Sequence, residues 1–423
     1  MAPSPPPHDA APTMARTDPD AEQLLYELML DPGNENPYDG YRRLREQAPA
    51  LVTGDGTLVL TRFEDCDTAL RHRSIGKSDD VLDLGIGDEA MDRPGTMVDL
   101  LRDSMLFANP PDHTRLRRLV SSAFTGRHVE ALRAAVTART QAMLEALAAE
   151  PGGDFMDAVA LPLPVNVISD LLGVPEADRL AFTPKVHALI AALEPTADRD
   201  TVALGERSGR ELVDYFTALL ADKRARPADD MLSRLVASHE DDALDEQEMI
   251  STALLLFAAG FETTTNLLGN GLHALLNSPD ELRRLRDRPD LMPTAIEELL
   301  RYDSPVQFSA RTVLEPVTVA GADLEPGRLV LTMFGAANHD PDRFTEPHRL
   351  DLGRDDGSHL AFASGLHFCL GAHLTRLEAQ VFLTLLVRRY DPAPAGDPVR
   401  RPSFTVRGFD RLPVTLSPLP GGG

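Results

Sequence analysis

The chain of 423 residues carries 42 basic and 66 acidic side chains, and its formal net charge of −24 argues against nucleic-acid binding, because neutralising phosphates requires clustered Lys and Arg. No apolar run approaches the roughly 18 residues of a membrane span, so we expect no membrane insertion. Two cysteines, Cys66 and Cys369, are too few for a disulfide framework, which predicts a reducing, cytoplasmic location.

The first segment, residues 1–20, is rich in proline and has neither the basic start nor the apolar stretch of an export signal. It predicts a disordered N-terminal arm. Nothing repeats at a fixed period, and no Gly/Ser linker divides the rest of the chain. We therefore expect a single domain over residues 21–418, mainly α-helical with a minor β-sheet region, followed by a flexible C-terminus at 419–423.

Strand signals are few. The clearest lies in residues 50–60, where Asp55 and Gly56 separate two β-prone runs and predict a hairpin. A second β-rich stretch covers residues 311–333. The sequence therefore predicts small sheets beside a helical body.

Helical periodicity covers residues 129–147 and 209–223, and a long helix is predicted over 246–277. Asp245 and Glu248 have the spacing of a capping box at its start. At ~1.5 Å per residue this helix is about 48 Å long, so it must cross the core of the domain.

The middle of this helix is unusual for a core segment, because it combines Gly260 and Glu262 with three consecutive threonines. A glycine costs ~1 kcal/mol relative to alanine in a helix interior. Two interpretations are open: a poorly packed surface helix, or a functional break in which small residues open space and backbone carbonyls meet water.

Cys369 lies in a loop that leads directly into a predicted helix over 372–389. Amide N–H groups at a helix start favour a thiolate, the form of cysteine that binds metal ions. Gly365 can turn the chain with positive φ, and Gly371 lets a flat cofactor approach the backbone. Cys66 has no such context and is expected to be a buried apolar residue.

Four segments, taken together and in order, resemble the cytochrome P450 monooxygenases of the bacterial soluble type. The resemblance covers nearly the whole chain after the N-terminal arm. The motifs are the Phe-x-x-Gly-x-His-x-Cys-x-Gly loop ending at Gly371, the Glu-x-x-Arg of Glu298 and Arg301 with Arg349 further on, the Ala-Gly-Phe-Glu-Thr-Thr run from Ala259, and the basic segment 111–117.

The resemblance implies a long central helix and a haem b cofactor. It makes Cys369 the iron ligand and Thr263 with Glu262 the residues that manage oxygen activation. Glu298, Arg301 and Arg349 are implied to form a structural ion-pair network behind the haem. Other implied cofactor-binding residues are His113, Arg117, Ala259, Arg311, Phe362, Gly365, His367 and Gly371.

Three positions depart from the family pattern. Glu262 stands where aspartate is common, Ala363 where glycine usually follows the phenylalanine, and Thr375 where alanine is usual. None of them removes an implied ligand of the haem.

The implied reaction inserts one oxygen atom from O₂ into an apolar substrate by hydroxylation or epoxidation. Because the chain has neither a dinucleotide fingerprint nor the cysteines of an iron–sulfur cluster, a ferredoxin and its reductase are expected to supply electrons. Basic residues proposed for their docking are Arg115, Arg118 and Arg376.

Expected substrate contacts are Ala258, Ala259, Val306 and Phe308, which indicate an apolar, roomy pocket. Resemblance to biosynthetic members of the family favours a polyketide, macrolide or terpenoid. Two alternatives stay open: a peroxygenase that uses hydrogen peroxide directly, and a haem-binding sensor without turnover.

Overall fold

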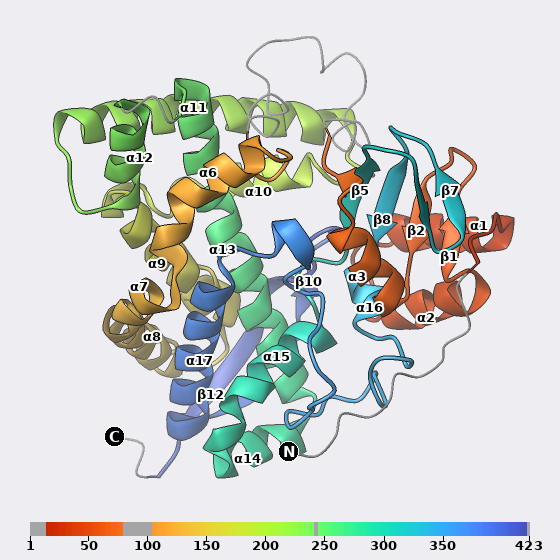
Figure 1. Ribbon diagram of the computed structural model, residues 1–423. Coiled ribbons are helices and arrows are strands. Elements are labelled where there is room, and N and C mark those ends of the chain that lie inside the picture. Colours follow the sequence, from red (N-terminus) through yellow and green to blue (C-terminus); the bar gives the residue numbers. More distant parts are fainter. Residues whose placement is uncertain (1–13, 79–103, 241–243, 421–423) are drawn as a thin grey trace.

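The computed structural model describes residues 14–78, 104–240 and 244–420, and helices dominate these ranges (Figure 1). The helix-rich body fills the left of Figure 1, and most strands lie with α1, α2 and α3 on the right. The mainly α fold with a minor sheet region is therefore confirmed. The helices are α1 (Pro19–Leu30), α2 (Tyr38–Gln47), α3 (Phe63–Arg71), α6 (Asp112–Ser121), α7 (Gly126–Ala131), α8 (Arg133–Ala148), α9 (Pro162–Leu172), α10 (Thr183–Ala191), α11 (Arg199–Ala225), α12 (Met231–Glu240), α13 (Glu246–Leu276), α14 (Pro279–Asp287), α15 (Met292–Tyr302), α16 (Phe334–Ala337) and α17 (Ala372–Arg389).

The strands form small sheets. In the largest, the order is β1-β2-β8-β5-β3, with β2 parallel to β8 and the other neighbours antiparallel. Smaller groups are β4-β12-β9, β10-β11 and β6-β7. The strands are β1 (Ala50–Val52), β2 (Leu58–Leu60), β3 (Ile75–Gly76), β4 (Gly153–Asp154), β5 (Ser309–Val313), β6 (Val317–Val319), β7 (Ala322–Leu324), β8 (Leu329–Thr332), β9 (Tyr390–Pro394), β10 (Val399–Arg400), β11 (Phe409–Arg411) and β12 (Pro413–Pro418).

The predicted hairpin is confirmed. Leu51 in β1 lies opposite Val59 in β2, and Gly56 in the turn has a φ of 87°, a conformation that glycine adopts without strain. The predicted helix over 209–223 is the C-terminal part of α11, and the one over 129–147 is divided at Leu132 into α7 and α8.

The chain joins the fold before residue 21. Arg16 forms a parallel bridge with Leu51, and the Asp18 side chain caps α1 by accepting from the Ala21 N–H at 3.0 Å. The boundary expected at residue 20 therefore lies inside α1. At the other end, the Leu419 N–H donates to the Arg389 carbonyl at 2.8 Å. Residues 1–13 of the expected arm and 421–423 of the expected tail lie outside the described ranges.

The long central helix is α13. Its predicted capping box is present: Asp245 accepts from the Glu248 N–H at 2.7 Å, and Glu248 accepts from the Asp245 N–H at 3.0 Å. The helix is continuous through Gly260 and most of its middle is buried, so both interpretations, the functional break and the poorly packed surface helix, were wrong. A Cβ at Gly260 would lie 2.4 Å from Ile168 Cγ1, so the glycine permits close packing of α9 on α13.

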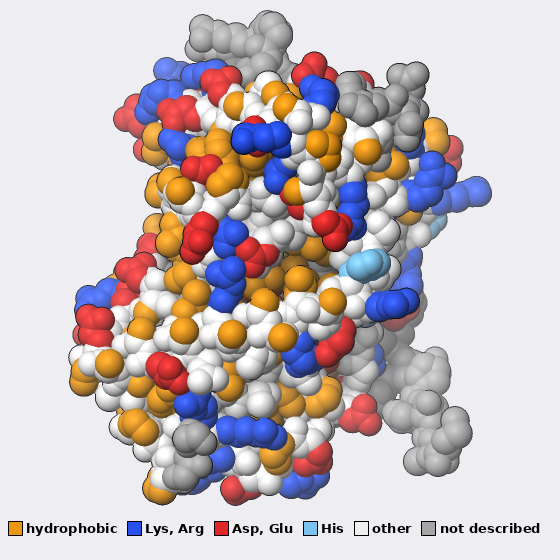
Figure 2. All heavy atoms as spheres, turned by 90° about the vertical axis from the view of Figure 1, so that its left-hand side faces the viewer, with side chains coloured by type: hydrophobic (Ala, Val, Ile, Leu, Met, Phe, Trp, Pro, Cys, Tyr) orange, Lys and Arg blue, Asp and Glu red, His pale blue; other side chains and the backbone are white. Residues whose placement is uncertain are grey.

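No helix within the described ranges is long and apolar enough to cross a bilayer. Figure 2 shows one face of the molecule, on which acidic and basic side chains are interspersed, with apolar side chains visible in a hollow at mid-height.

A buried ionic network joins α15 to the irregular segment that follows α16. Arg301 donates to both oxygens of Glu298 at 2.7 and 2.9 Å, and also to the carbonyls of Asn338 and Pro347 at 2.7 and 2.9 Å. The Glu298 carboxylate further accepts from the Asp351 N–H at 2.9 Å. The network expected behind the haem is thus present in Glu298 and Arg301.

The second arginine of the network is Arg354, and the prediction of Arg349 was wrong. Arg354 Nε lies 3.0 Å from Glu298, and its side chain is buried. Arg349 is 56% exposed and pairs with Glu346 and Asp351. The Glu-x-x-Arg motif places Glu298 and Arg301 three residues apart on α15, so their pairing follows from the sequence. Which later arginine reaches Glu298 depends on the path of the irregular segment.

We expect Arg354→Ala to lower the free energy of unfolding by ~3–5 kcal/mol, because it leaves the buried Glu298 carboxylate with too few cationic partners. Arg349→Ala is the matched control, with a cost of at most ~1 kcal/mol because its pairs are exposed. Guanidinium unfolding of both variants measures the difference. Equal destabilisation by the two variants would contradict the assignment of Arg354 to the network.

Candidate active site

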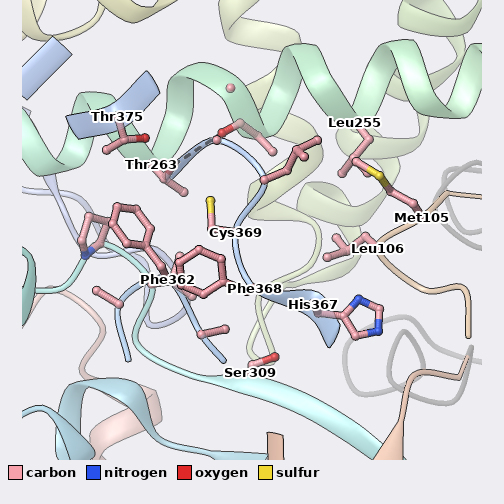
Figure 3. Close-up of a pocket in the computed structure, with 18 of the residues that line it drawn as sticks. Met105, Leu106, Leu255, Thr263, Ser309, Phe362, His367, Phe368, Cys369 and Thr375 are labelled. Carbon is pink, nitrogen blue, oxygen red and sulfur yellow. Dashed lines mark hydrogen bonds between the residues drawn. The ribbon is translucent and has the colours of Figure 1, made fainter. Parts of the chain in front are cut away.

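A largely apolar pocket lies between α13 and the loop that precedes α17. Figure 3 shows the Cys369 sulfur in the space next to the long helix that carries Leu255 and Thr263. Most of the described residues that line the pocket come from α6 and the segment before it, α13, the segment 305–311, the cysteine loop and the start of α17.

The cysteine loop directs Cys369 into this pocket. The Cys369 N–H donates to the Phe362 carbonyl at 3.0 Å, which closes the loop. Gly365 has a φ of 71°, and a Cβ there would lie 2.4 Å from the Leu70 carbonyl oxygen, so the position requires glycine on both counts. The expected turn at Gly365 is therefore present, although this residue does not line the pocket.

Burial raises the pKa of the Cys369 thiol. The N–H groups of Gly371 and Ala372 and the charge of Arg117 act in the opposite direction without offsetting burial. The helix start alone is thus insufficient to make a thiolate here, and a bound metal ion would supply the remaining driving force. The loop around Cys369 leaves room for one: apart from its chain neighbours, the described residues place only Cys369 Sγ within 4 Å of a Cβ at Gly371, at 3.9 Å.

Two departures from the family pattern have visible consequences. Ala363 has a φ of 56°, in the left-handed region where glycine is preferred. Thr375 lines the pocket, and its hydroxyl lies 3.2 Å from the hydroxyl of Thr264. This contact joins α17 to α13 beside the pocket.

Four residues predicted to hold haem carboxylates do line the pocket together, namely His113, Arg117, Arg311 and His367. The rings of His113 and His367 lie 4.4 Å apart, and each has a buried nitrogen without a hydrogen-bond partner, Nδ1 of His113 and Nε2 of His367. Arg117 donates to the Phe368 carbonyl at 2.6 Å. The structure thus brings these side chains to one edge.

The electrostatics of this edge call for an anion. Burial lowers the pKa of Arg311 to about 10, and burial together with the neighbouring cations lowers the pKa of His367 to about 2. None of the described residues that line the pocket is acidic. Arg117 and Arg311 therefore have no acidic partner among these residues, and an anionic ligand would stabilise their charges.

Lys77 is a pocket residue that the sequence did not identify. It lies just after β3, is buried, and its Nζ donates to the Ala310 carbonyl at 2.9 Å. Burial lowers the pKa of this lysine well below its usual range. A lone lysine in a loop is typical of a solvated surface, and no local signal in the sequence distinguishes this one.

On α13, Ala259 and Thr263 line the pocket as predicted, and the Thr263 hydroxyl donates to the Ala259 carbonyl at 3.4 Å. Ala258 does not line it, so that predicted contact was wrong. The pocket follows the helix face of Leu255, Ala259 and Thr263 together with Leu256 and Gly260 on one side of it, and Ala258 lies about 100° from Ala259 on the other side. Val306 and Phe308 line the pocket as predicted. Further apolar lining residues missed by the sequence analysis are Met105, Leu106, Leu255 and Leu256.

Glu262 points away from the pocket and is 2% exposed. It forms an ion pair with Arg401, and His187 Nε2 lies 3.0 Å from its second oxygen without the alignment of a hydrogen bond. Although burial by itself raises the pKa of Glu262, the neighbouring His187, Arg401 and Asn266 lower it to about 2. The carboxylate is therefore deprotonated and ion-paired with Arg401.

These features fit a haem. The pocket offers a cysteine sulfur as an iron ligand, a glycine-bordered space beside it, apolar walls for a porphyrin, and a cationic edge with unpartnered imidazole nitrogens for its two carboxylates. The donor set and the charge distribution both match this cofactor.

Comparisons with known proteins agree. A family model described as "Cytochrome P450" matches residues 210–415. Cytochrome P450 107B1 of Saccharopolyspora erythraea is 40% identical over 393 residues, 90% of this chain and 95% of that protein. The polyketide biosynthesis cytochrome P450 PksS of Bacillus subtilis is 36% identical over 410 residues, 94% of this chain and 100% of that protein. The tirandamycin C-bound P450 monooxygenase TamI is similar in structure, with a TM-score of 0.81, 34% identity, and coverage of 96% of this chain and 100% of that chain.

We expect reduced protein with CO to show the red-shifted Soret band of a thiolate-bound haem, and Cys369→Ala to lose it, because no other described lining residue offers a thiolate. Cys66→Ala is the control. Its sulfur is buried in a separate apolar cluster and donates to the Leu60 carbonyl at 3.3 Å, so the band should remain. A Cys369→Ala protein that kept the band would overturn the assignment.

Proposed function

Because the chain belongs to the cytochrome P450 family of haem-thiolate monooxygenases, we propose that it inserts one oxygen atom from O₂ into a bulky apolar small molecule, by hydroxylation or epoxidation. One observation carries this proposal. Cys369 from the loop before α17 and Thr263 from α13 face the same apolar pocket, and that pocket has a cationic edge.

Haem b, when bound, supplies the binding and reductive activation of O₂. The protein's part is to hold it. Cys369 would ligate the iron, and a thiolate ligand favours O–O cleavage by donating electron density. His113, Arg117, Arg311 and His367 would bind the haem carboxylates, joined by Lys77.

Thr263 would position a proton on the pocket side of α13. Its hydrogen bond to the Ala259 carbonyl is long, at 3.4 Å, so the hydroxyl can turn toward a ligand at small energetic cost. Neighbouring Thr264 and Thr265 are buried and do not line the pocket. Thr263 is therefore the alcohol of this run that we assign to catalysis.

Glu262 would relay protons only after its carboxylate separates from Arg401, because the ion pairs hold it deprotonated and turned away from the pocket. The arrangement supports a relay that operates in a rearranged state of the enzyme. In the state described, Glu262 does not line the pocket.

The two alternatives are less well supported. A peroxygenase would not need a hydroxyl-bearing residue at position 263 of the pocket, and a sensor without turnover would not need it either. A cytoplasmic location remains a prediction.

The substrate class we propose is a polyketide, macrolide or terpenoid intermediate. The name of PksS places that relative in polyketide biosynthesis, and TamI was solved with tirandamycin C bound. In this chain, Leu255, Val306 and Phe308 give the pocket apolar walls suited to such a molecule.

A ferredoxin and its reductase would supply the electrons. The expected docking patch consists of Arg115, Arg118 and Arg376. Arg115 forms an ion pair with Glu248, and Arg376 forms one with Glu297 at 2.7 Å. We therefore propose Arg118 as the docking cation. Exposed Arg118 lies on α6, the helix whose Arg117 bonds to the cysteine loop. In that loop Leu366 is 46% and Phe368 41% exposed. This combination of a cation and apolar side chains suits an acidic electron donor.

We expect Thr263→Val to retain haem and bind substrate while uncoupling the reaction, because it keeps the shape of the side chain and removes the hydroxyl. With a surrogate ferredoxin and reductase, product formed per reduced nicotinamide should fall by about tenfold or more, since a positioned proton donor contributes ~10²–10⁴-fold. Hydrogen peroxide should account for the missing electrons. Thr264→Val and Thr265→Val serve as controls and should stay coupled. If Thr263→Val stays coupled, its assignment is wrong.

We expect Arg118→Glu to raise the KM for ferredoxin about 3–10-fold at low ionic strength and less at high salt, because exposed charges steer association and are screened. Arg43→Glu, an exposed arginine of α2 in the strand-rich part of the molecule, makes the same change in net charge. Steady-state kinetics at several salt concentrations measure both. An equal effect of the two variants would indicate a nonspecific charge effect and contradict docking at Arg118.

A further inference from the structure

Glu194 is a buried carboxylate that neither lines the pocket nor belongs to the proposed catalytic set. It lies just after α10, in the connection to α11, and is 6% exposed. Its carboxylate accepts hydrogen bonds from the Ser403 hydroxyl, from the Phe404 N–H at 3.0 Å and from the Thr405 N–H at 3.2 Å. One side chain thus binds three consecutive residues of a distant segment.

This contact places a charge where it is costly. Burial raises the pKa of Glu194, and the hydrogen bonds from Ser403, Phe404 and Thr405 lower it without offsetting burial. An apolar residue would avoid that cost. What the carboxylate adds is geometry, because it fixes the direction of two backbone N–H groups and one hydroxyl at once.

The segment that Glu194 holds supports the wall of the pocket. The Gln307 N–H donates to the Thr405 carbonyl at 3.0 Å, and Val306 forms an antiparallel bridge with Val406. The ring of Phe404 packs against that of Phe308 with centroids 5.4 Å apart. Val306 and Phe308 both line the pocket, as does the next residue, Ser309, which is labelled in Figure 3.

The same segment has a second anchor. Arg401, two residues before Ser403, forms an ion pair with Glu262 of α13. The stretch 401–406 is therefore held between Glu194, from the α10–α11 connection, and Glu262, from the long helix. Neither carboxylate lines the pocket, yet both position the residues behind its wall.

We infer that Glu194 is a positioning residue for substrate selection: by fixing residues 403–405 it holds Phe308 and Val306 in place as the wall against which a bulky apolar ligand packs. This inference rests on the proposed haem function. It predicts that the affinity for large ligands depends on Glu194, whereas the affinity of the iron for small ligands does not.

The test compares two nitrogenous ligands of the iron. Imidazole is small enough to bind the iron without touching the wall, and econazole carries bulky aryl groups that must pack on it. We expect Glu194→Gln, which keeps the side-chain shape and removes the charge, to weaken econazole binding about tenfold, equal to ~1.4 kcal/mol. The Kd for imidazole and the CO spectrum should be unchanged. Optical titration of the holoenzyme measures both constants.

Glu211→Gln is the matched control, because Glu211 is an exposed carboxylate of α11 paired with Lys185, and it should change neither constant. Ser403→Ala removes one hydrogen-bond donor to Glu194 and should weaken econazole binding by a smaller factor. If Glu194→Gln does not fold, this variant provides the test. Unchanged econazole binding in Glu194→Gln overturns the inference, as does equal weakening for both ligands. If the wild-type protein gives no spectral response to imidazole, the haem function itself is overturned, and this inference with it.

Discussion

The carboxylate of Glu298 is the interaction on which the active-site side of the molecule depends. It accepts from Arg301, Arg354 and the Asp351 N–H, all within 3.1 Å, and is almost completely buried. Arg301 in turn binds the carbonyls of Asn338 and Pro347. A long irregular segment without its own ladder of hydrogen bonds is thereby organised around one helix.

The position of the cysteine loop depends on the Glu298 network. The Asn338 side chain accepts from the Leu360 N–H at 2.7 Å, just before the loop that carries Cys369. From there the chain turns at Gly365 and enters α17, which packs against α13 through the Thr264 and Thr375 hydroxyls. A network whose own residues do not line the pocket thus helps to position the sulfur relative to the long helix.

Three buried glutamates organise different parts of the molecule. Glu298 fixes the irregular segment, Glu262 joins α13 to Arg401, and Glu194 joins the α10–α11 connection to residues 403–405. Glu298 and Glu262 pair with arginines, and Glu194 accepts from two backbone N–H groups and a hydroxyl. In each case the carboxylate helps to specify the relative position of segments that are distant in the sequence.

The sequence by itself determined what depends on local chemistry: the capping box that starts α13, the turn at Gly56, the start of α17 after Gly371, and the motif that presents Cys369. It could not determine which arginine reaches Glu298, that Lys77 is buried at the pocket edge, or that Glu262 faces Arg401 instead of the pocket. Those outcomes depend on how distant segments approach one another, because a side chain's partners follow from tertiary packing, whereas caps, turns and periodicity follow from neighbours along the chain.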